Sequence, residues 1–231
     1  MNEEILPDAE AVAHRAAAVI AEAARDAVAA RGRFVLATSG GATPWRMLEE
    51  LATEEVPWDR VHLFQVDERV APDGHPDRNL THLRASLLAR LPRAPAGVHA
   101  MPVEEPDLAA AAAGYALTLR SVAGEPPVLD LVHLGLGADG HTASLVPGDA
   151  ALSAVTDVAV TGPYQGHRRL TLTFPALYRA RRILWVVTGA AKATALARLL
   201  QGDRAIPAGL VRNDRALVLA DVAAHLGSPL P

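Results

Sequence analysis

The chain has 231 residues, half of them apolar, which is enough for one α/β domain with a sizeable core or for two small domains. Of the two, we expect a single α/β domain over residues 1–231. The formal net charge of −4, with no basic tract, argues against nucleic acid as a main partner. It has no cysteine, which excludes disulfides and thiolate metal sites. No apolar run approaches the ~20 residues of a membrane-spanning helix, and residues 1–7 lack the basic and apolar regions of a signal peptide, so we expect a cytoplasmic protein.

The first predicted elements lead to a glycine-rich turn. Apolar residues recur at steps of three and four over residues 8–30, which predicts a long helix that Gly32 ends. A strand over residues 33–38 runs into Ser39-Gly40-Gly41-Ala42-Thr43-Pro44, where Thr43 is expected to cap the next helix. A strand, two glycines and a helix N-terminus form an anion site, because free N–H groups and the helix dipole face the turn. Unless this is a plain βα connection, the candidate anion ligands are Ser39, Gly40, Gly41 and Thr43.

A second strand, over residues 61–66, ends in three consecutive charged residues, Asp67-Glu68-Arg69. Charges are costly to bury, so this run at a strand end favours a functional site over a core position. A polar loop over residues 70–80 follows and is expected to be a lid or a substrate wall. We then expect helices over residues 79–91 and 107–122, separated by a proline- and alanine-rich surface connection over residues 91–106.

The stretch that organises the chain is an apolar run over residues 129–134, followed by Gly135-Leu136-Gly137-Ala138-Asp139-Gly140-His141. The run predicts a strand buried on both faces, and the three glycines let the backbone approach a ligand closely. Such a turn delivers Asp139 and His141 to the C-terminal edge of the sheet, where open α/β sheets bind ligands. A carboxylate beside an imidazole supports acid–base chemistry near pH 7. The alternative is a turn with a solvated histidine.

The last predicted elements place a single lysine at a third turn. Strands are expected over residues 155–160 and 168–174, then a short helix opened by Pro175, and a buried strand over residues 183–188. Gly189 turns that strand into a helix whose first turn holds Lys192, the only lysine among 22 basic residues. A compact charge there favours an anion site, with a solvated helix residue as the alternative. A last strand over residues 216–220 and a short helix close the chain.

Together these turns resemble those of the 6-phosphogluconolactonase family. The matching segments, in the family's order, are Ser39 to Pro44, Asp67 to Arg69 with His75 and Asn79, Gly135 to Gly148, Arg169 to Thr173, and Thr188-Gly189 with Lys192. The resemblance implies a modified doubly wound, Rossmann-like, mostly parallel sheet with helices on both faces, as in glucosamine-6-phosphate deaminase. It also implies hydrolysis of 6-phospho-D-glucono-1,5-lactone to 6-phosphogluconate, the second step of the oxidative pentose phosphate pathway, with no metal or organic cofactor.

The chain departs from the family's pattern at two places. Arg78 stands just before Asn79, where the family often has serine, so the contribution of this position is open. Val146 stands where the family often has phenylalanine, which exchanges one apolar residue for another.

The residues predict a mechanism in which His141 takes a proton from the water that attacks the lactone carbonyl. Asp139 or Asp67 would orient the imidazole, and Arg69 would either stabilise the oxyanion or hold the phosphate. The expected partner is a small phosphorylated sugar, with neither nucleic acid nor membrane, bound by a monomer or weak homodimer. The residues expected around the phosphate are Ser39, Gly40, Gly41, Thr43, Arg169 and Lys192, with Arg168 as an adjacent candidate.

Two rival functions remain open at this point. In a glucosamine-6-phosphate deaminase-like isomerase, the loop resembles Asp-Gly-His followed by a catalytic glutamate. This chain has Val146 at that place, which disfavours ring-opening chemistry. A non-catalytic sugar-phosphate sensor of the kind fused to transcription regulators would need a DNA-binding module, whereas residues 1–33 predict only one helix and the chain is acidic.

Overall fold

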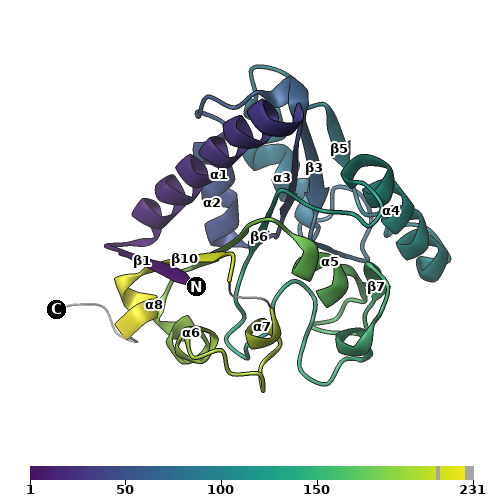
Figure 1. The fold of residues 1–231 in the computed structure, drawn as a ribbon. Helices are drawn as coiled ribbons and strands as arrows, with labels where there is room; N and C mark the ends of the chain where they lie inside the picture. Colours follow the sequence, from purple (N-terminus) through teal and green to yellow (C-terminus); the bar gives the residue numbers. More distant parts are fainter. Residues whose placement is uncertain (212–213, 227–231) are drawn as a thin grey trace.

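Seven parallel strands form the main sheet of the structure, a computed structural model that describes residues 1–211 and 214–226 (Figure 1). Within this described part, the strand order is β1-β10-β9-β6-β2-β3-β5. The bounds are β1 Asn2–Leu6, β2 Phe34–Thr38, β3 Val61–Gln65, β5 Gly97–His99, β6 Leu131–Leu134, β9 Ile183–Val187 and β10 Ala216–Asp221. A second, antiparallel sheet has the order β4-β8-β7, with β4 Asp67–Arg69, β7 Val158–Val160 and β8 Arg169–Leu172.

Helices cover both faces of the main sheet, and each face has its own apolar core. One face is covered by α1 (Ala9–Arg31), α2 (Ala42–Leu51) and α3 (Asn79–Ser86). The other is covered by α4 (Leu108–Ala123), α5 (Phe174–Arg179), α6 (Ala193–Leu200), α7 (Pro207–Leu210) and α8 (Val222–Leu226). In Figure 1, α1 and α2 lie on one side of β3 and α4 lies on the other. The predicted doubly wound, mostly parallel fold is thus confirmed.

The strands alternate their side chains between the two cores. Along β2, Phe34 and Leu36 belong to the core under α1, whereas Val35 and Ala37 belong to the core under α4. This is the pattern of a strand buried on both faces, because successive side chains point to opposite sides of a sheet. The continuous apolar runs that predicted buried strands therefore follow from the two helical layers.

The long first helix begins and ends as its sequence predicts. The Asp8 side chain accepts a hydrogen bond from the backbone N–H of Ala11 at 2.9 Å, which satisfies one of the free N–H groups of the first turn. Gly32 ends the helix in the left-handed region, with φ at 73°, a conformation that costs glycine little. Local chemistry therefore fixes both ends of α1.

The prediction that Thr43 caps α2 is wrong. The helix begins at Ala42, and Gly41 stands at the N-cap without a side-chain cap. The Thr43 hydroxyl instead forms a 2.5 Å hydrogen bond with that of Thr188, at the end of β9. A tertiary contact thus takes the group that local pattern assigned to a cap, and it joins the first turn to the third.

Two other expectations differ from the structure, and some elements were not predicted at all. The predicted helix over residues 79–91 ends at Ser86, and a separate 3₁₀ turn, η2, spans Leu88–Arg90. The predicted surface connection over residues 91–106 contains strand β5, and its Met101 and Val103 are buried. Strand β1 and helix α7 were not predicted. β5 is short and β1 polar, so neither carries a strong local signal; their partners β3 and β10 define them.

A carboxylate from β4 holds the N-terminus of α3. Glu68 is fully buried and accepts hydrogen bonds from the backbone N–H groups of Asn79 and Leu80, both at 2.8 Å. The buried Arg78 places Nε 3.3 Å from this carboxylate and donates from Nη1 to the Ala71 carbonyl at 2.7 Å. The pairing compensates the buried charge of Glu68. Arg78, which departs from the family's pattern, therefore supports α3.

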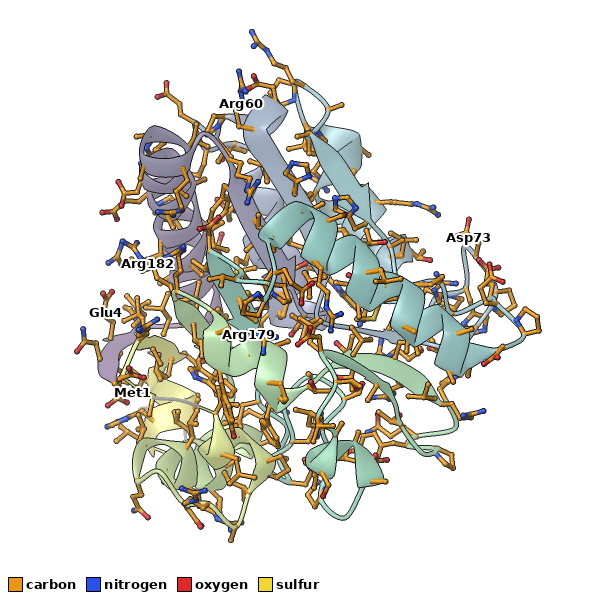
Figure 2. All side chains as sticks on the ribbon, turned by 45° about the vertical axis from the view of Figure 1, so that its right-hand side comes forward. Met1, Glu4, Arg60, Asp73, Arg179 and Arg182 are labelled. Carbon is orange, nitrogen blue, oxygen red and sulfur yellow. The ribbon has the colours of Figure 1, made fainter. Side chains whose placement is uncertain are left out.

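The outer surface carries most of the charged side chains, among them Arg60, Arg182 and Asp73 (Figure 2). Asp73 lies on the loop between β4 and α3, where its carboxylate accepts a hydrogen bond from Arg84 at 2.7 Å. None of the helices in the described part of the chain combines the length and the hydrophobicity that crossing a bilayer requires.

Candidate active site

A cleft of about 300 Å³ opens at the C-terminal ends of four neighbouring strands, β9, β6, β2 and β3. Open α/β sheets bind ligands at this edge, and the volume is that of a small-molecule site. The turns expected to converge do so here. The predicted site residues that line the cleft are Ser39, Gly40, Gly41, Thr43, Asp67, Arg69, His141, Arg169 and Lys192.

An imidazole–carboxylate pair stands at one wall of the cleft. His141 Nδ1 lies 2.6 Å from Asp139 Oδ1, and the same oxygen accepts the backbone N–H of His141 at 3.1 Å. Partial burial would raise the pKa of Asp139, but the hydrogen bonds from His141 outweigh it and hold that pKa below its usual value. Because Nδ1 faces the carboxylate, Nε2 is the nitrogen that remains for a substrate or a water.

Gly137 makes room for this pair. A Cβ built on Gly137 would overlap the His141 ring and the Asp139 carboxylate. The Gly137 backbone also donates to the carbonyl of His141 at 2.8 Å, and Gly140 donates to the carbonyl of Gly137 at 3.0 Å. The glycines of the turn therefore fold it back tightly enough to hold the imidazole against its own backbone.

Of the two acids that the sequence left open as partners of His141, Asp139 makes the contact. Asp67 lies buried at the base of the cleft, where it accepts a 2.6 Å hydrogen bond from the Ser144 hydroxyl. Burial raises the pKa of Asp67, although Ser144 and the neighbouring Arg69 and Arg169 favour its carboxylate form. Asp67 thus faces the arginines of the cleft.

Two arginines lie directly opposite each other on the small antiparallel sheet. Arg69 of β4 pairs in register with Arg169 of β8. Like charges opposite each other on neighbouring strands are unfavourable. Asn79 Oδ1 and the Asp77 carbonyl accept hydrogen bonds from Arg69 Nη1 at 2.9 and 2.8 Å. Arg169 is 3% exposed, its buried Nε has no partner among the described residues, and burial lowers its pKa. This arrangement favours the arrival of an anion.

The first and third turns meet at the other side of the cleft. The Thr43–Thr188 hydrogen bond joins the N-terminus of α2, whose first N–H groups lack helical partners, to the turn after β9. The Asp221 carboxylate accepts the N–H of Gly189 at 3.0 and 3.1 Å, which holds that turn in place. The 3₁₀ turn η4 (Ala190–Lys192) then brings Lys192 to the cleft. The arrangement provides a cation beside a helix N-terminus.

Ser39 lines the cleft, but its backbone N–H and its hydroxyl both donate hydrogen bonds to His133, which lies below the cleft. Its backbone N–H donates to Nδ1 of His133 at 3.3 Å, and its hydroxyl donates to the His133 carbonyl at 3.1 Å. His133 is fully buried in β6. Ser39 therefore supports the glycine turn from below, while Gly40 and Gly41 present the backbone above it.

We expect His133 to make stability fall as the pH decreases below about 6.5. Burial lowers the pKa of His133 to about 3, whereas a histidine in an unfolded chain titrates near 6.5. Between these values the unfolded chain binds a proton that the folded chain does not. The free energy of unfolding should therefore fall by about 1.4 kcal/mol per pH unit as the pH decreases.

Urea unfolding of wild-type protein and His133→Asn at about pH 7.5 and pH 5.5 checks this expectation. The loss of stability on acidification should be about 1.4 kcal/mol smaller in His133→Asn. His14→Asn, which changes an exposed histidine, is the matched control and should keep the wild-type dependence. Equal losses in wild type and His133→Asn would contradict this role of His133.

Two of the predicted site residues lie outside the cleft lining, and several residues that lie next to the cleft have no role predicted from the sequence. Asp139 stands behind His141, and Arg168 is exposed at the start of β8.

Asn79 was part of the family's pattern without an assigned role, and its amide connects Arg69 and Asp67. The turn signals that the sequence offers in the segment over residues 161–168 are the Gly162-Pro163 dipeptide and Gly166. The neighbours without a sequence-based role are Ser144, Tyr164, Gln165, Thr188 and Asp221.

Comparison with known sequences places the chain among proteins of one family model. The model of glucosamine-6-phosphate isomerases and 6-phosphogluconolactonases matches residues 7–219. A 6-phosphogluconolactonase of Nostoc sp. is 37% identical over 229 residues, which covers 96% of this chain and 95% of that protein. A 6-phosphogluconolactonase of Streptomyces coelicolor is 35% identical over 243 residues, covering 97% and 92%.

Solved structures agree with this placement. The 6-phosphogluconolactonase from Thermotoga maritima superposes with a TM-score of 0.86 at 27% identity, covering 95% of this chain and 98% of that one. A monomeric glucosamine-6-phosphate deaminase superposes with a TM-score of 0.84 at 20% identity, covering 97% and 98%. The second likeness is one of fold alone.

Proposed function

The chain belongs to the family of glucosamine-6-phosphate isomerases and 6-phosphogluconolactonases, and from that membership we propose that it is a lactone hydrolase that opens 6-phospho-D-glucono-1,5-lactone to 6-phospho-D-gluconate. This reaction is the second step of the oxidative pentose phosphate pathway. The observation that carries the proposal is one cleft lined by both His141, paired with Asp139, and three cationic side chains. A phosphorylated lactone needs a base at its carbonyl and cations at its phosphate.

His141 acts as the general base. Asp139 holds Nδ1 with its proton, so Nε2 takes a proton from water while the water oxygen attacks C1 of the lactone. The carbonyl electrons move onto the oxygen and form a tetrahedral oxyanion. When this collapses, the bond from C1 to the ring oxygen breaks, and the imidazolium returns its proton to that oxygen. Asp139 stabilises the imidazolium in between.

Arg69 stabilises the oxyanion. Its Nη1 is already held by the Asp77 carbonyl and Asn79 Oδ1, so the guanidinium needs little rearrangement as charge develops. Arg169 and Lys192 hold the phosphate together with the backbone at Gly40, Gly41 and Thr43. The Arg169 guanidinium lines the cleft and can donate charge-assisted hydrogen bonds to a phosphate there.

The two rival functions make different demands. A deaminase-like isomerase would place an acid where this chain has Val146, which is apolar and buried. A sugar-phosphate sensor would bind its ligand without turnover. The dyad of His141 and Asp139 supports turnover, because a pure binding site gains nothing from an oriented base.

A coupled assay tests the proposal. Freshly made 6-phosphogluconolactone is offered to the protein, and acid release is compared with spontaneous opening at the same pH. We expect release above the spontaneous rate, in proportion to protein concentration. Release at the spontaneous rate would contradict the proposal, and ammonia from glucosamine 6-phosphate would favour the isomerase.

Three further expectations accompany the function. We propose a cytoplasmic enzyme, a monomer or weak homodimer, that needs no metal or organic cofactor. Each of these stays a prediction.

A further inference from the structure

The segment that joins β7 to β8 forms a tight turn at the rim of the cleft. Tyr164 and His167 exchange backbone hydrogen bonds at 2.9 and 3.2 Å. Gln165 and Gly166 between them both have positive φ, at 49° and 83°, as a two-residue hairpin turn requires. The backbone conformation of this turn therefore fixes the position of the Tyr164 Cα atom and the direction of its Cα–Cβ bond.

The far side of this turn is anchored to another loop. His167 Nε2 lies 2.9 Å from Asp77 Oδ2, and His167 Nδ1 lies 3.2 Å from the Val70 carbonyl. Both partners belong to the loop between β4 and α3, whose Asp77 carbonyl also holds Arg69. The turn is thus held from two directions.

Tyr164 contacts both the Asp139–His141 pair and the anion-binding Arg169. Its hydroxyl donates to Asp139 Oδ2 at 3.2 Å, the carboxylate oxygen that His141 Nδ1 does not use. Its ring meets that of His141 edge to face, with centroids 5.4 Å apart and planes at 68°. On the other side, the Arg169 guanidinium carbon lies 5.1 Å from the ring centroid, and Arg169 Nη2 donates to the Tyr164 carbonyl at 3.4 Å.

We propose that Tyr164 is a positioning residue that couples the anion-binding Arg169 to the Asp139–His141 pair. The inference rests on the proposed function, and the role that it adds is the link between the two parts. The hydroxyl fixes the second carboxylate oxygen, so the carboxylate plane and with it the imidazole keep one orientation. The ring holds the guanidinium by a cation–π contact, so a phosphate drawn to Arg169 meets a preformed base.

The Tyr164 hydroxyl is suited to be the donor in this contact. Burial and the adjacent Asp139 carboxylate raise the pKa of Tyr164, so the phenol keeps its proton at neutral pH. The charged and titratable groups that face the cleft near the pair are Asp67, Arg69, Arg169 and Lys192.

Tyr164→Phe tests the hydroxyl alone, because it keeps the ring against His141 and Arg169. We expect kcat to fall about 3- to 10-fold, the cost of one hydrogen bond, with KM unchanged. The Asp139 carboxylate loses a donor and holds the Nδ1 proton more strongly. The acidic limb of the kcat/KM profile should therefore move to higher pH by about 0.5 unit.

Tyr164→Ala tests the ring as well. It removes the cation–π contact with Arg169, so KM for the phosphorylated lactone should rise in addition, by about 3- to 10-fold. Tyr178→Phe is the matched control: its ring stacks on Phe174 with centroids 5.7 Å apart, outside the cleft lining. It should behave as wild type.

NMR gives a readout that does not depend on turnover. The Cε1–H signal of His141, assigned by its loss in His141→Ala, should have a different chemical shift in Tyr164→Phe than in wild type or Tyr178→Phe, because the Asp139 carboxylate that contacts Nδ1 loses a hydrogen-bond donor. An active wild type with unchanged kcat, pH profile and His141 Cε1–H chemical shift in Tyr164→Phe would overturn this role and leave the proposed function intact. An inactive wild type would instead overturn the proposed function.

Discussion

Replacing His141 with alanine is expected to lower enzyme-dependent opening of the phosphorylated lactone at pH 7 by about 10²- to 10⁴-fold. In the proposed mechanism the imidazole is the base, and the Asp139 carboxylate orients it at 2.6 Å. Without the ring, the attacking water would have to give its proton to bulk solvent. The effect should fall on kcat, because we propose that cations elsewhere in the cleft bind the phosphate. The measurement is the coupled assay with the spontaneous rate subtracted.

His14→Ala is the matched control for this variant. It removes an exposed histidine of α1 and should keep wild-type turnover. Circular dichroism and a thermal melt confirm that His141→Ala is folded, which is expected because the ring is partly exposed and lies on a turn. A folded His141→Ala protein with near wild-type turnover would contradict the assignment of the base.

Replacing Lys192 with alanine is expected to raise KM for the phosphorylated lactone by about 10- to 100-fold, the cost of one hydrogen bond to a charged group. Lys192 reaches the cleft from a turn held by Asp221 and joined by Thr188 to the N-terminus of α2. A cation at this place is favourable only when an anion binds between it and the helix N-terminus. The measurement compares KM for 6-phosphogluconolactone and for unphosphorylated gluconolactone.

The comparison of the two lactones makes this test specific. Unphosphorylated gluconolactone offers no phosphate, so Lys192→Ala should leave its KM within about twofold of wild type. Arg198→Ala, which removes a cation of α6 that pairs with Asp203, is the control and should leave both constants unchanged. An equal rise of KM for both lactones would mean that Lys192 does not recognise the phosphate.

Much of the site could be predicted because its parts are encoded locally. The Asp139–His141 pair lies two residues apart on one glycine turn, and the parallel sheet places that turn beside those of Gly40 and Lys192. A buried strand followed by glycines is therefore enough to locate the cleft. The helix α1 is predictable for the same reason, since Asp8 and Gly32 act on their own neighbours.

The rest depends on contacts between distant residues. Thr43 carries a good cap signal, but Thr188, 145 positions away, takes its hydroxyl. Asp67 and Asp139 were equivalent in sequence as partners of the base, and only the three-dimensional arrangement assigns Asp67 to Ser144. Tyr164 lies 25 positions from Asp139 in a segment without clear periodicity. Such contacts leave no periodic trace in the sequence, because they depend on where whole turns are placed.

The three charged residues of β4 also show that contacts between distant residues decide what a local sequence pattern leaves open. The three consecutive charges Asp67-Glu68-Arg69 were expected to serve a site at the end of a strand, but they form the separate strand β4 and make different contacts. Asp67 and Arg69 line the cleft, whereas Glu68 turns away and holds α3 with Arg78. Alternation along β4 explains the split, since successive side chains of a strand point to opposite faces.

In the proposed function, His141 and the anion-binding residues around the Gly40–Gly41 turn bind the two ends of one small molecule. A crystal structure with 6-phosphogluconate bound tests it most directly. We expect the phosphate on the Gly40–Gly41 turn beside Arg169 and Lys192, with the C1 carboxylate within reach of His141 Nε2, directly or through one water. A phosphate bound away from that turn, or a C1 carboxylate too far from Nε2 for a single water to bridge, would contradict it.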